Sequence, residues 1–286
     1  MPGYREYKAK LTSLGNMRRV TAAMKMLSAA RFARAQDAQR RARRFLREAA
    51  TLTATVARAA DLSAHPLVEA RPAGQPALAL LICSDMGLCG GFNNNLVRQL
   101  QDWLAARPAD APALVSFVGR RGHVALRRRV AVRAVYPGAV RPDLRYAADI
   151  ARDLLAGYRA QAYGAVHLAY NVFHNANAQT PTVAPLLPLA LPEDREAGPA
   201  AGPVLFEPPA AALADRLLEQ AVVCRLFAAL LENAAGEHGA RMTAMENASR
   251  NIDQLRERYT LLRNRARQSA ITQELNEVVS GAEALK

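Results

Sequence analysis

The last quarter of the chain, from Ala210 to about Ala284, repeats apolar residues every three or four positions and contains no proline. This spacing predicts one amphipathic helix. Met245, Ile252 and Tyr259 stand seven apart, as in the seam of a coiled coil. A helix of about 75 residues would be roughly 110 Å long, far more than the width of a compact domain of this chain length, so it needs a partner. Its apolar stripe comprises Val222, Leu226, Leu230, Met242, Met245, Ile252, Leu255, Tyr259, Leu262, Ile271, Leu275 and Val278.

Residues 1–60 predict that partner. No proline follows Gly3 before about Ala60, and apolar residues again recur at steps of three and four. Gly15 costs this helix about 1 kcal/mol relative to alanine, which the surrounding helix-forming residues can absorb. We expect the two terminal helices, 1–60 and 210–286, to pair as a long antiparallel coiled coil. The N-terminal stripe comprises Tyr4, Tyr7, Leu11, Leu14, Met17, Val20, Met24 and Leu27.

Between these helices the pattern changes to short apolar runs that alternate with helical segments. Residues 72–192 therefore predict an inserted, Rossmann-like α/β domain with a mostly parallel sheet. Thr180–Leu191 carries three prolines, which favours an edge strand, and residues 193–209 are rich in proline, glycine and alanine, as in a linker. The expected strands are 77–83, 113–118, 130–136 and 165–171, and the expected helices are 94–106 and 144–158.

The positive charge is concentrated at the N-terminus. Of the net +13, residues 1–60 contribute +11, with fourteen Arg and Lys against three acids, whereas residues 210–286 are neutral. Arg40, Arg41, Arg43 and Arg44 fall within five positions. This asymmetry predicts an acidic partner for the N-terminal segment: nucleic acid, lipid headgroups or protein.

Several classes of protein are disfavoured by the sequence. No run of eighteen uncharged apolar residues exists to span a bilayer, and the charges that begin at Arg5 argue against a secretory signal. The Arg-rich N-terminus resembles a transit peptide, but its apolar stripe belongs to the expected coiled coil. Three cysteines without metal-ligand spacing indicate a reducing compartment, and the five histidines show no ligand pattern either.

The glycine-rich loop Ser84–Asn93 offers the only candidate chemistry. It follows a strand and precedes a helix, where phosphates bind in many α/β proteins, but it matches neither a dinucleotide fingerprint nor a P-loop. Its Gly-Leu-Cys-Gly-Gly run also has the spacing of a nucleophile elbow with Cys89 as nucleophile. Asp143 or Asp149 and His167 or His174 would complete such a thiol hydrolase. The simplest interpretation is a tight loop that packs on neighbouring backbone.

Four blocks of the chain closely resemble the gamma subunit of F-type ATP synthases, the central rotor shaft of that complex. They stand in the family's order and are spread over nearly the whole chain. The last block, which contains Arg267 and Gln268, is the most specific. The blocks are Val20–Ala30, Ser84–Asn93, Pro181–Pro188, and Ala240–Asn247 together with Asn264–Leu275.

The resemblance implies a mechanical function. In this family the shaft turns inside a ring of three alpha and three beta subunits, and its rotation couples ATP synthesis or hydrolysis to ion flow through a membrane ring of c subunits. The gamma subunit itself is then expected to have no catalytic residue, cofactor or metal. The main alternative is a basic coiled-coil protein that binds nucleic acid or an anionic membrane surface, and the third is the thiol hydrolase.

The resemblance also implies contact residues. Arg267, Gln268 and Thr272 should touch the alpha and beta loops that grip the shaft, and Met24 and Lys25 should face an acidic segment of beta. Glu207 matches the foot that rests on the c ring beside the epsilon subunit. The expected location is the cytoplasmic side of a bacterial inner membrane, as a peripheral protein. The chain departs from the family pattern at Gly15, Met17, Ala23, Met86, Val204 and Phe206.

Overall fold

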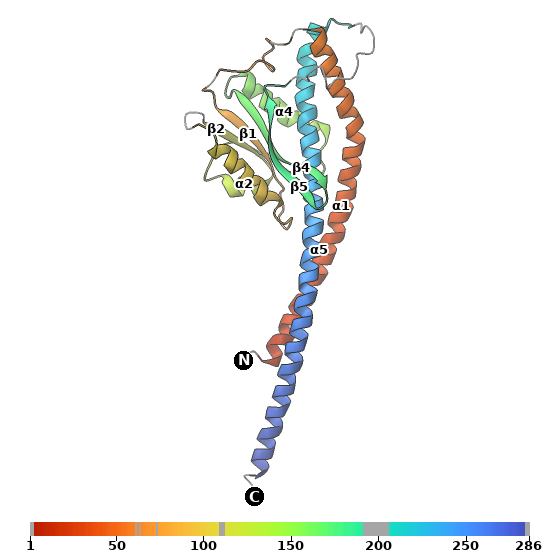
Figure 1. Ribbon diagram of the computed structural model, residues 1–286, viewed down its shortest axis with the longest axis vertical. Coiled ribbons are helices and arrows are strands. Elements are labelled where there is room, and N and C mark those ends of the chain that lie inside the picture. The colour runs from red at the N-terminus through yellow and green to blue at the C-terminus, as the bar shows by residue number, and fades with distance from the viewer. Residues whose placement is uncertain are drawn as a thin grey trace. The chain divides into compact units, whose positions relative to one another are not determined.

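The computed structural model describes residues 3–60, 62, 64–72, 74–108, 112–190 and 206–283. The chain divides into two compact units, residues 1–28 with 241–286, and residues 29–240. We call the first the coiled-coil unit and the second the sheet unit. Helices α1 (Tyr4–Ala59) and α5 (Ala210–Glu283) contribute to both, so each helix is treated in two parts (Figure 1). No helix among the described residues is long and apolar enough to cross a membrane.

In the coiled-coil unit the two helices run antiparallel, as the sequence predicts. Near the start of α1, the Tyr7 ring lies 6.1 Å from that of Tyr259, measured between centroids. Farther along α1, Thr21 Oγ1 and Ser249 Oγ are 2.9 Å apart, so the residue numbers of the two helices run in opposite directions. Met245 and Ile252, each 5% exposed, lie in the interface. The predicted seven-residue seam of α5 is therefore confirmed here.

The predicted seam of α1 is wrong beyond Leu14. Met17, Val20 and Leu27 each keep about half of their surface exposed, between 52% and 58%. The positions that face α5 are instead polar: Arg18 bonds to Asp253, Lys25 forms an ion pair with Glu246, and Ser28 is buried. The inward set Tyr7, Leu11, Leu14, Arg18, Thr21, Lys25 and Ser28 keeps the coiled-coil spacing of three and four. This part of the seam is therefore formed by polar residues that bond to polar partners, and not by the apolar residues that the hydrophobic pattern favoured.

The ion pair between Arg18 and Asp253 should make helix pairing depend on pH. Arg18 Nε lies 2.6 Å from Asp253 Oδ1 and holds the pKa of that carboxyl below its usual value. A depressed carboxyl pKa stabilises the folded state above the unfolded pKa, about 4 for Asp, and this stabilisation is lost as the pH falls through the folded value. We expect Asp253→Asn to speed hydrogen exchange of amides 4–27 at pH 7, and the variant and wild type to converge as the pH falls below about 4.

The matched control for this prediction is Asp37→Asn on the exposed surface of α1. Asp37 forms only a long ion pair with Arg40, at 3.9 Å within the same helix. A long ion pair within one helix cannot hold two helices together, so exchange should stay unchanged at pH 7 and below about pH 4. Equal exchange in wild type and Asp253→Asn at pH 7 would show that the polar seam does not hold the helices together.

The sheet unit contains five strands in the order β3-β2-β1-β4-β5. Strands β1, β2, β3 and β4 are parallel, and β5 joins β4 in the antiparallel sense. The mostly parallel sheet and the proline-bearing edge strand are thus confirmed, although β4 extends four residues beyond the predicted end. The strands are β1 (Ala77–Ile82), β2 (Ala113–Val118), β3 (Ala131–Tyr136), β4 (Ala165–Asn175) and β5 (Ala178–Leu187).

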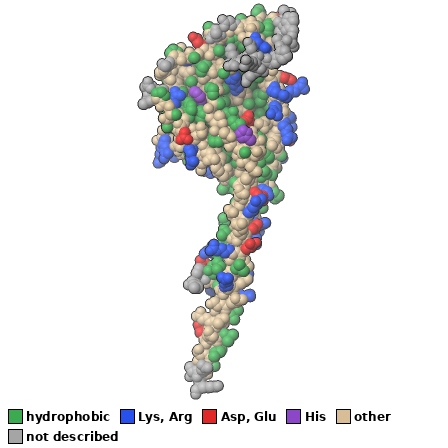
Figure 2. All heavy atoms as spheres, viewed as in Figure 1, with side chains coloured by type: hydrophobic (Ala, Val, Ile, Leu, Met, Phe, Trp, Pro, Cys, Tyr) green, Lys and Arg blue, Asp and Glu red, His purple; other side chains and the backbone are tan. Residues whose placement is uncertain are grey.

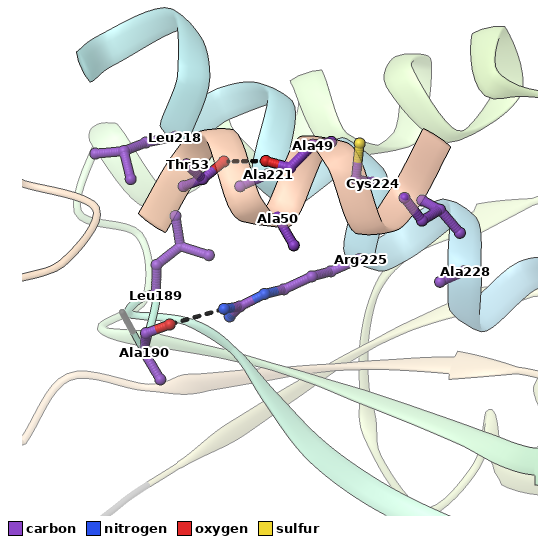
Figure 3. Close-up of a pocket in the computed structure, with 11 residues that line it drawn as sticks. Ala49, Ala50, Thr53, Leu189, Ala190, Leu218, Ala221, Cys224, Arg225 and Ala228 are labelled. Carbon is purple, nitrogen blue, oxygen red and sulfur yellow. Dashed lines mark hydrogen bonds between the residues drawn. The ribbon is translucent and has the colours of Figure 1, made fainter. Parts of the chain in front are cut away.

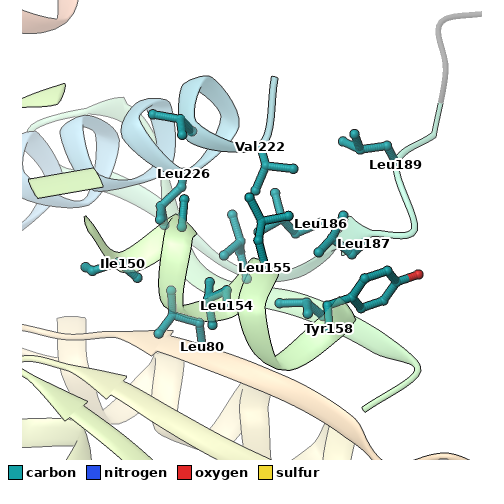
Figure 4. Close-up of a cluster of buried hydrophobic side chains, with 14 of the residues drawn as sticks. Leu80, Ile150, Leu154, Leu155, Tyr158, Leu186, Leu187, Leu189, Val222 and Leu226 are labelled. Carbon is teal, nitrogen blue, oxygen red and sulfur yellow. The ribbon is translucent and has the colours of Figure 1, made fainter. Parts of the chain in front are cut away.

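Alternating side chains of β1 divide the core between the two faces of the sheet. Leu78, Leu80 and Ile82 pack against α4 (Leu144–Arg159) and against Leu218, Val222 and Leu226 of α5 (Figure 4). Ala79, Leu81 and Cys83 pack on the other face against α2 (Phe92–Ala105) and α3 (Arg120–Leu126). Both faces are covered, as a parallel sheet requires. The Rossmann-like prediction is confirmed, but α3 was missed because seven residues are too short for a helical period to emerge.

Candidate partner-binding surfaces

Hydrogen bonds between its own residues help to hold the loop Ser84–Asn93. Buried Asn93 accepts a hydrogen bond from Ser84 N at 3.1 Å and donates to Ser84 Oγ at 2.7 Å and to Cys89 Sγ at 3.2 Å. Ser84 Oγ in turn donates to the Met86 carbonyl at 2.6 Å. Asn93 thus fixes both ends of the glycine-rich turn from the first turn of α2. This bonding supports the interpretation of the loop as a structural element.

The crevice where doubly wound sheets bind nucleotides is filled in this protein. That crevice lies at the carboxyl ends of the strands where the strand order reverses, here between β1 and β4. The turn after β2 packs directly on the end of β1: Arg121 N donates to the Ser84 carbonyl at 3.1 Å, and Arg120 N donates to Asp85 Oδ1 at 2.9 Å. Asn171 of β4 bridges to the Phe92 carbonyl. The remaining cavity beside Ser84 and Asn233 is about 50 Å³, room for water but not for a nucleotide.

The residues of the thiol-hydrolase hypothesis are engaged elsewhere. Asp143 caps α4 by accepting from Tyr146 N at 2.8 Å, and Asp149 pairs with Arg152. His174 bonds to Thr180 across the β4–β5 hairpin. His167 lies in register with Ala79 near the start of β1 and stacks on Trp103 at the end of α2, whereas Cys89 precedes α2. The structure therefore does not assemble them into a catalytic site.

The cysteines and the possible metal ligands also argue against a catalytic site. Cys89 is 3% exposed, and burial raises the pKa of the Cys83 thiol. Such thiols are poor nucleophiles, because the thiolate is the reactive form. Within the described ranges no group of three or more His, Cys, Asp or Glu residues could hold a metal ion.

The end of α5 is the most exposed apolar surface of the coiled-coil unit. Every described side chain from Arg267 to Ala282 is exposed. Ile271, Leu275 and Val278 are 51%, 60% and 72% exposed, and their spacing of four and three residues puts them on one side of the helix. Figure 2 shows hydrophobic side chains at the surface of this end of the molecule. Such a stripe in water is unfavourable and is typical of a surface that other protein covers. The sequence predicted a pair of helices here, but α1 begins at Tyr4, and the register with Tyr259 leaves this end of α5 unpaired.

The predicted contact residues Arg267, Gln268 and Thr272 lie on this exposed end. Gln268 and Thr272 are one helical turn apart, and Thr272 Oγ1 donates to the Gln268 carbonyl at 3.0 Å. All three side chains are exposed, so they are available for polar contacts beside the apolar stripe. Arg267 and Ile271 are also four residues apart and share one side of the helix.

A second exposed apolar surface lies on α1 in the same unit. It consists of Met17, Val20 and Leu27; Met26, which is 70% exposed, lies on another side of the same helix. Predicted contact residue Met24 is half-buried beside this surface, and Lys25 is half-buried and pairs with Glu246. Sequence reasoning assigned Met17, Val20 and Leu27 to the seam. The heptad of polar residues beginning at Arg18 was the signal that could have shown them to face outward.

The remaining predicted contacts lie in the sheet unit. Glu207 is exposed three residues before α5, and Phe206 beside it is half-buried. Val204 and most of the predicted linker 193–209 lie outside the described residues. Arg41, Arg43 and Arg47 are exposed on α1, and Arg44 pairs with Glu48 of the same helix. The basic segment thus presents its charge to solvent.

Comparisons with known proteins cover the whole chain. A sequence model of the ATP synthase family matches residues 3–285. An ATP synthase gamma chain of Geobacter metallireducens is 38% identical over 289 residues, with all of both chains aligned. One of Anaeromyxobacter sp. (strain Fw109-5) is 42% identical over 294 residues, again with full coverage of both.

Solved structures agree on the fold. A chain of the Tetrahymena thermophila mitochondrial ATP synthase central stalk and c ring superposes with a TM-score of 0.60 at 24% identity, over 80% of this chain and 99% of that one. A chain of the Euglena gracilis mitochondrial ATP synthase superposes with a TM-score of 0.66 at 19% identity, over 99% of this chain and 94% of that one. Together with the sequence matches over its full length, this fold shows that the chain belongs to the family of ATP synthase gamma chains.

Proposed function

We propose that this chain is the non-catalytic central shaft of a rotary F-type ATP synthase. In this role it couples ion flow through a membrane c ring to ATP synthesis or hydrolysis on beta subunits, and it regulates the ATPase activity. The observation that carries the proposal is the unpaired end of α5, whose exposed Ile271, Leu275 and Val278 need a surrounding protein surface. The filled crevice beside β1 and the dispersed catalytic candidates leave a mechanical role as the best-supported function.

The proposed partners follow from the family resemblance, and the exposed surfaces support them. Three alpha and three beta subunits would surround the end of α5, with Arg267, Gln268 and Thr272 in contact with their loops. Met24 and Lys25 would face an acidic segment of beta, which would compete with Glu246 for the Lys25 ammonium. Glu207 would rest on the c ring beside the epsilon subunit. The coupling ion, proton or sodium, would be chosen by the c ring rather than by this chain.

The domain organisation that we propose for this role keeps the boundaries expected from the sequence: helical segments 1–60 and 210–286, an α/β domain over 72–192, and a linker over 193–209. One copy per complex would sit at the cytoplasmic side of a bacterial inner membrane. It would contact the membrane only through its partners.

Co-purification tests the proposed function. The tagged chain, co-expressed with alpha and beta subunits of its own organism, should elute with them in a 1:3:3 ratio and support ATP hydrolysis. The chain alone should show no ATPase or esterase activity. A chain that stays monomeric beside the other subunits and binds DNA with a steep salt dependence would instead support the nucleic-acid alternative.

A further inference from the structure

A pocket of about 210 Å³ lies within the sheet unit, between α1 and the first turns of α5 (Figure 3). Leu189 and Ala190, which follow β5, close its third side. Its deepest residues, Thr53, Leu189, Leu218 and Cys224, are all less than 9% exposed. The Thr53 hydroxyl donates to the Ala49 carbonyl of its own helix at 2.8 Å, so it does not present a free polar group to the pocket. The deep part is therefore apolar.

Arg225 places a positive charge at the mouth of this pocket. In Figure 3 its side chain leaves α5, passes below Ala50 and ends at the Ala190 carbonyl, to which Nη2 donates at 2.7 Å. The residue as a whole remains exposed, and so do Ala50 and Ala190. Partial burial lowers the pKa of the guanidinium only from a very high value, so it stays charged at neutral pH.

The charge of Arg225 lacks a carboxylate partner in the part of the chain that the structure describes. Its one recorded contact there is the neutral Ala190 carbonyl. Glu219, six residues before Arg225 on α5, pairs with Arg159 and not with Arg225. A guanidinium has five N–H donors, so most of them remain available to an anion.

We propose that this pocket binds a small amphiphilic carboxylate, with its alkyl chain against Leu189, Leu218 and Cys224 and its carboxylate on Arg225. The ligand and the pocket are complementary, because a carboxylate matches the guanidinium fork of Arg225 and an alkyl chain matches the apolar depth of the pocket. The open mouth leaves the carboxylate in contact with water, so little hydration is lost on binding.

The volume of the pocket sets the length of the ligand. A dry apolar cavity of about 150 Å³ holds a six-carbon ring, so 210 Å³ suits a chain of about eight carbons. Octanoate has this length and is the probe that we choose. With about ten non-hydrogen atoms, it should bind in the micromolar to millimolar range.

Cys224 provides a reporter inside the pocket. Its thiol lines the wall, and burial raises its pKa, so alkylation by N-ethylmaleimide should be slow. Octanoate added to the purified full chain should slow alkylation of Cys224 at least threefold at saturation. Peptide mass spectrometry separates Cys224 from Cys83 and Cys89, whose alkylation should not respond. Unchanged alkylation of Cys224 up to the solubility limit of octanoate would overturn the proposal.

Two comparisons isolate the role of the charge. Octan-1-ol and octylamine have the same chain without the carboxylate, and both should bind at least about tenfold more weakly than octanoate, as expected for a lost charge-assisted hydrogen bond. Arg225→Met should weaken the binding of octanoate by the same factor and leave the binding of octan-1-ol unchanged. If octan-1-ol equals octanoate in the wild type, the pocket recognises only apolar groups and the proposed anion site is wrong.

Control variants separate binding from folding. Arg43→Met removes an exposed charge from a neighbouring groove that shares Leu46 with the pocket, and octanoate should bind this variant as it binds the wild type. Ala221→Leu should fill part of the pocket and weaken octanoate and octan-1-ol together, with an unchanged circular dichroism spectrum. Sedimentation should show a monomer with and without octanoate; a dimer that octanoate dissociates would mean that a second copy of the chain occupies the pocket.

Discussion

Replacing Gly119 by alanine is expected to lower the free energy of unfolding by at least about 4 kcal/mol, a size reached only by the most disruptive substitutions. Gly119 has φ of 84° and ψ of 157°, a backbone region open almost only to glycine, where other residues store about 1–3 kcal/mol of strain. An added Cβ would also stand 2.2 Å from the Cys83 carbonyl oxygen. The obstacle is backbone, so the end of β1 would have to move away from β2.

Urea unfolding of the purified chain measures this effect, and Gly15→Ala is the matched control. Gly15 lies within α1, and a Cβ there meets no atom within 4 Å. Alanine should therefore stabilise α1 by up to about 1 kcal/mol through its helix propensity. The two glycine-to-alanine changes should have opposite signs. A Gly119→Ala variant as stable as the wild type would mean that the contact between the two strand ends is loose, and the crevice could then admit a ligand.

The main elements of the fold could be predicted because their residue patterns are long and regular. Seven-residue spacing of Met245, Ile252 and Tyr259 located the seam of α5, and the continuous apolar run of β1 matched a sheet covered on both faces. The register of α1 could not be predicted in the same way. The hydrophobic pattern placed Met17, Val20 and Leu27 in the seam. The register depends instead on pairing between the two helices, in which Asp253 binds Arg18 and Glu246 binds Lys25.

The candidate contact residues followed from the family resemblance rather than from local physics. Arg267, Gln268 and Thr272 bond to nothing outside their own helix in the described chain, so no pattern of internal pairing could mark them. The pocket at Arg225 was equally hidden, because its walls come from α1, α5 and the segment after β5. Such sites arise from tertiary packing, which a periodicity within one helix does not contain.

Replacing Arg267 and Gln268 together by alanine is expected to lower the ATPase activity of the assembled complex at least tenfold while the isolated chain stays folded. Both side chains are exposed on the unpaired end of α5, so truncation removes no contact with the rest of the chain that the structure describes. If the surrounding subunits bind these groups, the loss of a buried, hydrogen-bonded charge costs about 2–5 kcal/mol at that interface. Steady-state ATP hydrolysis and ATP-driven ion pumping by the purified complex measure the effect.

Arg152→Ala provides the matched control, because it removes another arginine, 75% exposed on α4, whose ion pair among the described residues is with Asp149 one turn away. It should leave hydrolysis and pumping unchanged. The circular dichroism and urea unfolding of the isolated double variant should match those of the wild type, since alanine favours the helix. Full activity of the double variant would show that the end of α5 is not gripped through Arg267 and Gln268. The apolar stripe of Ile271, Leu275 and Val278 would then be the remaining surface through which α5 transmits rotation.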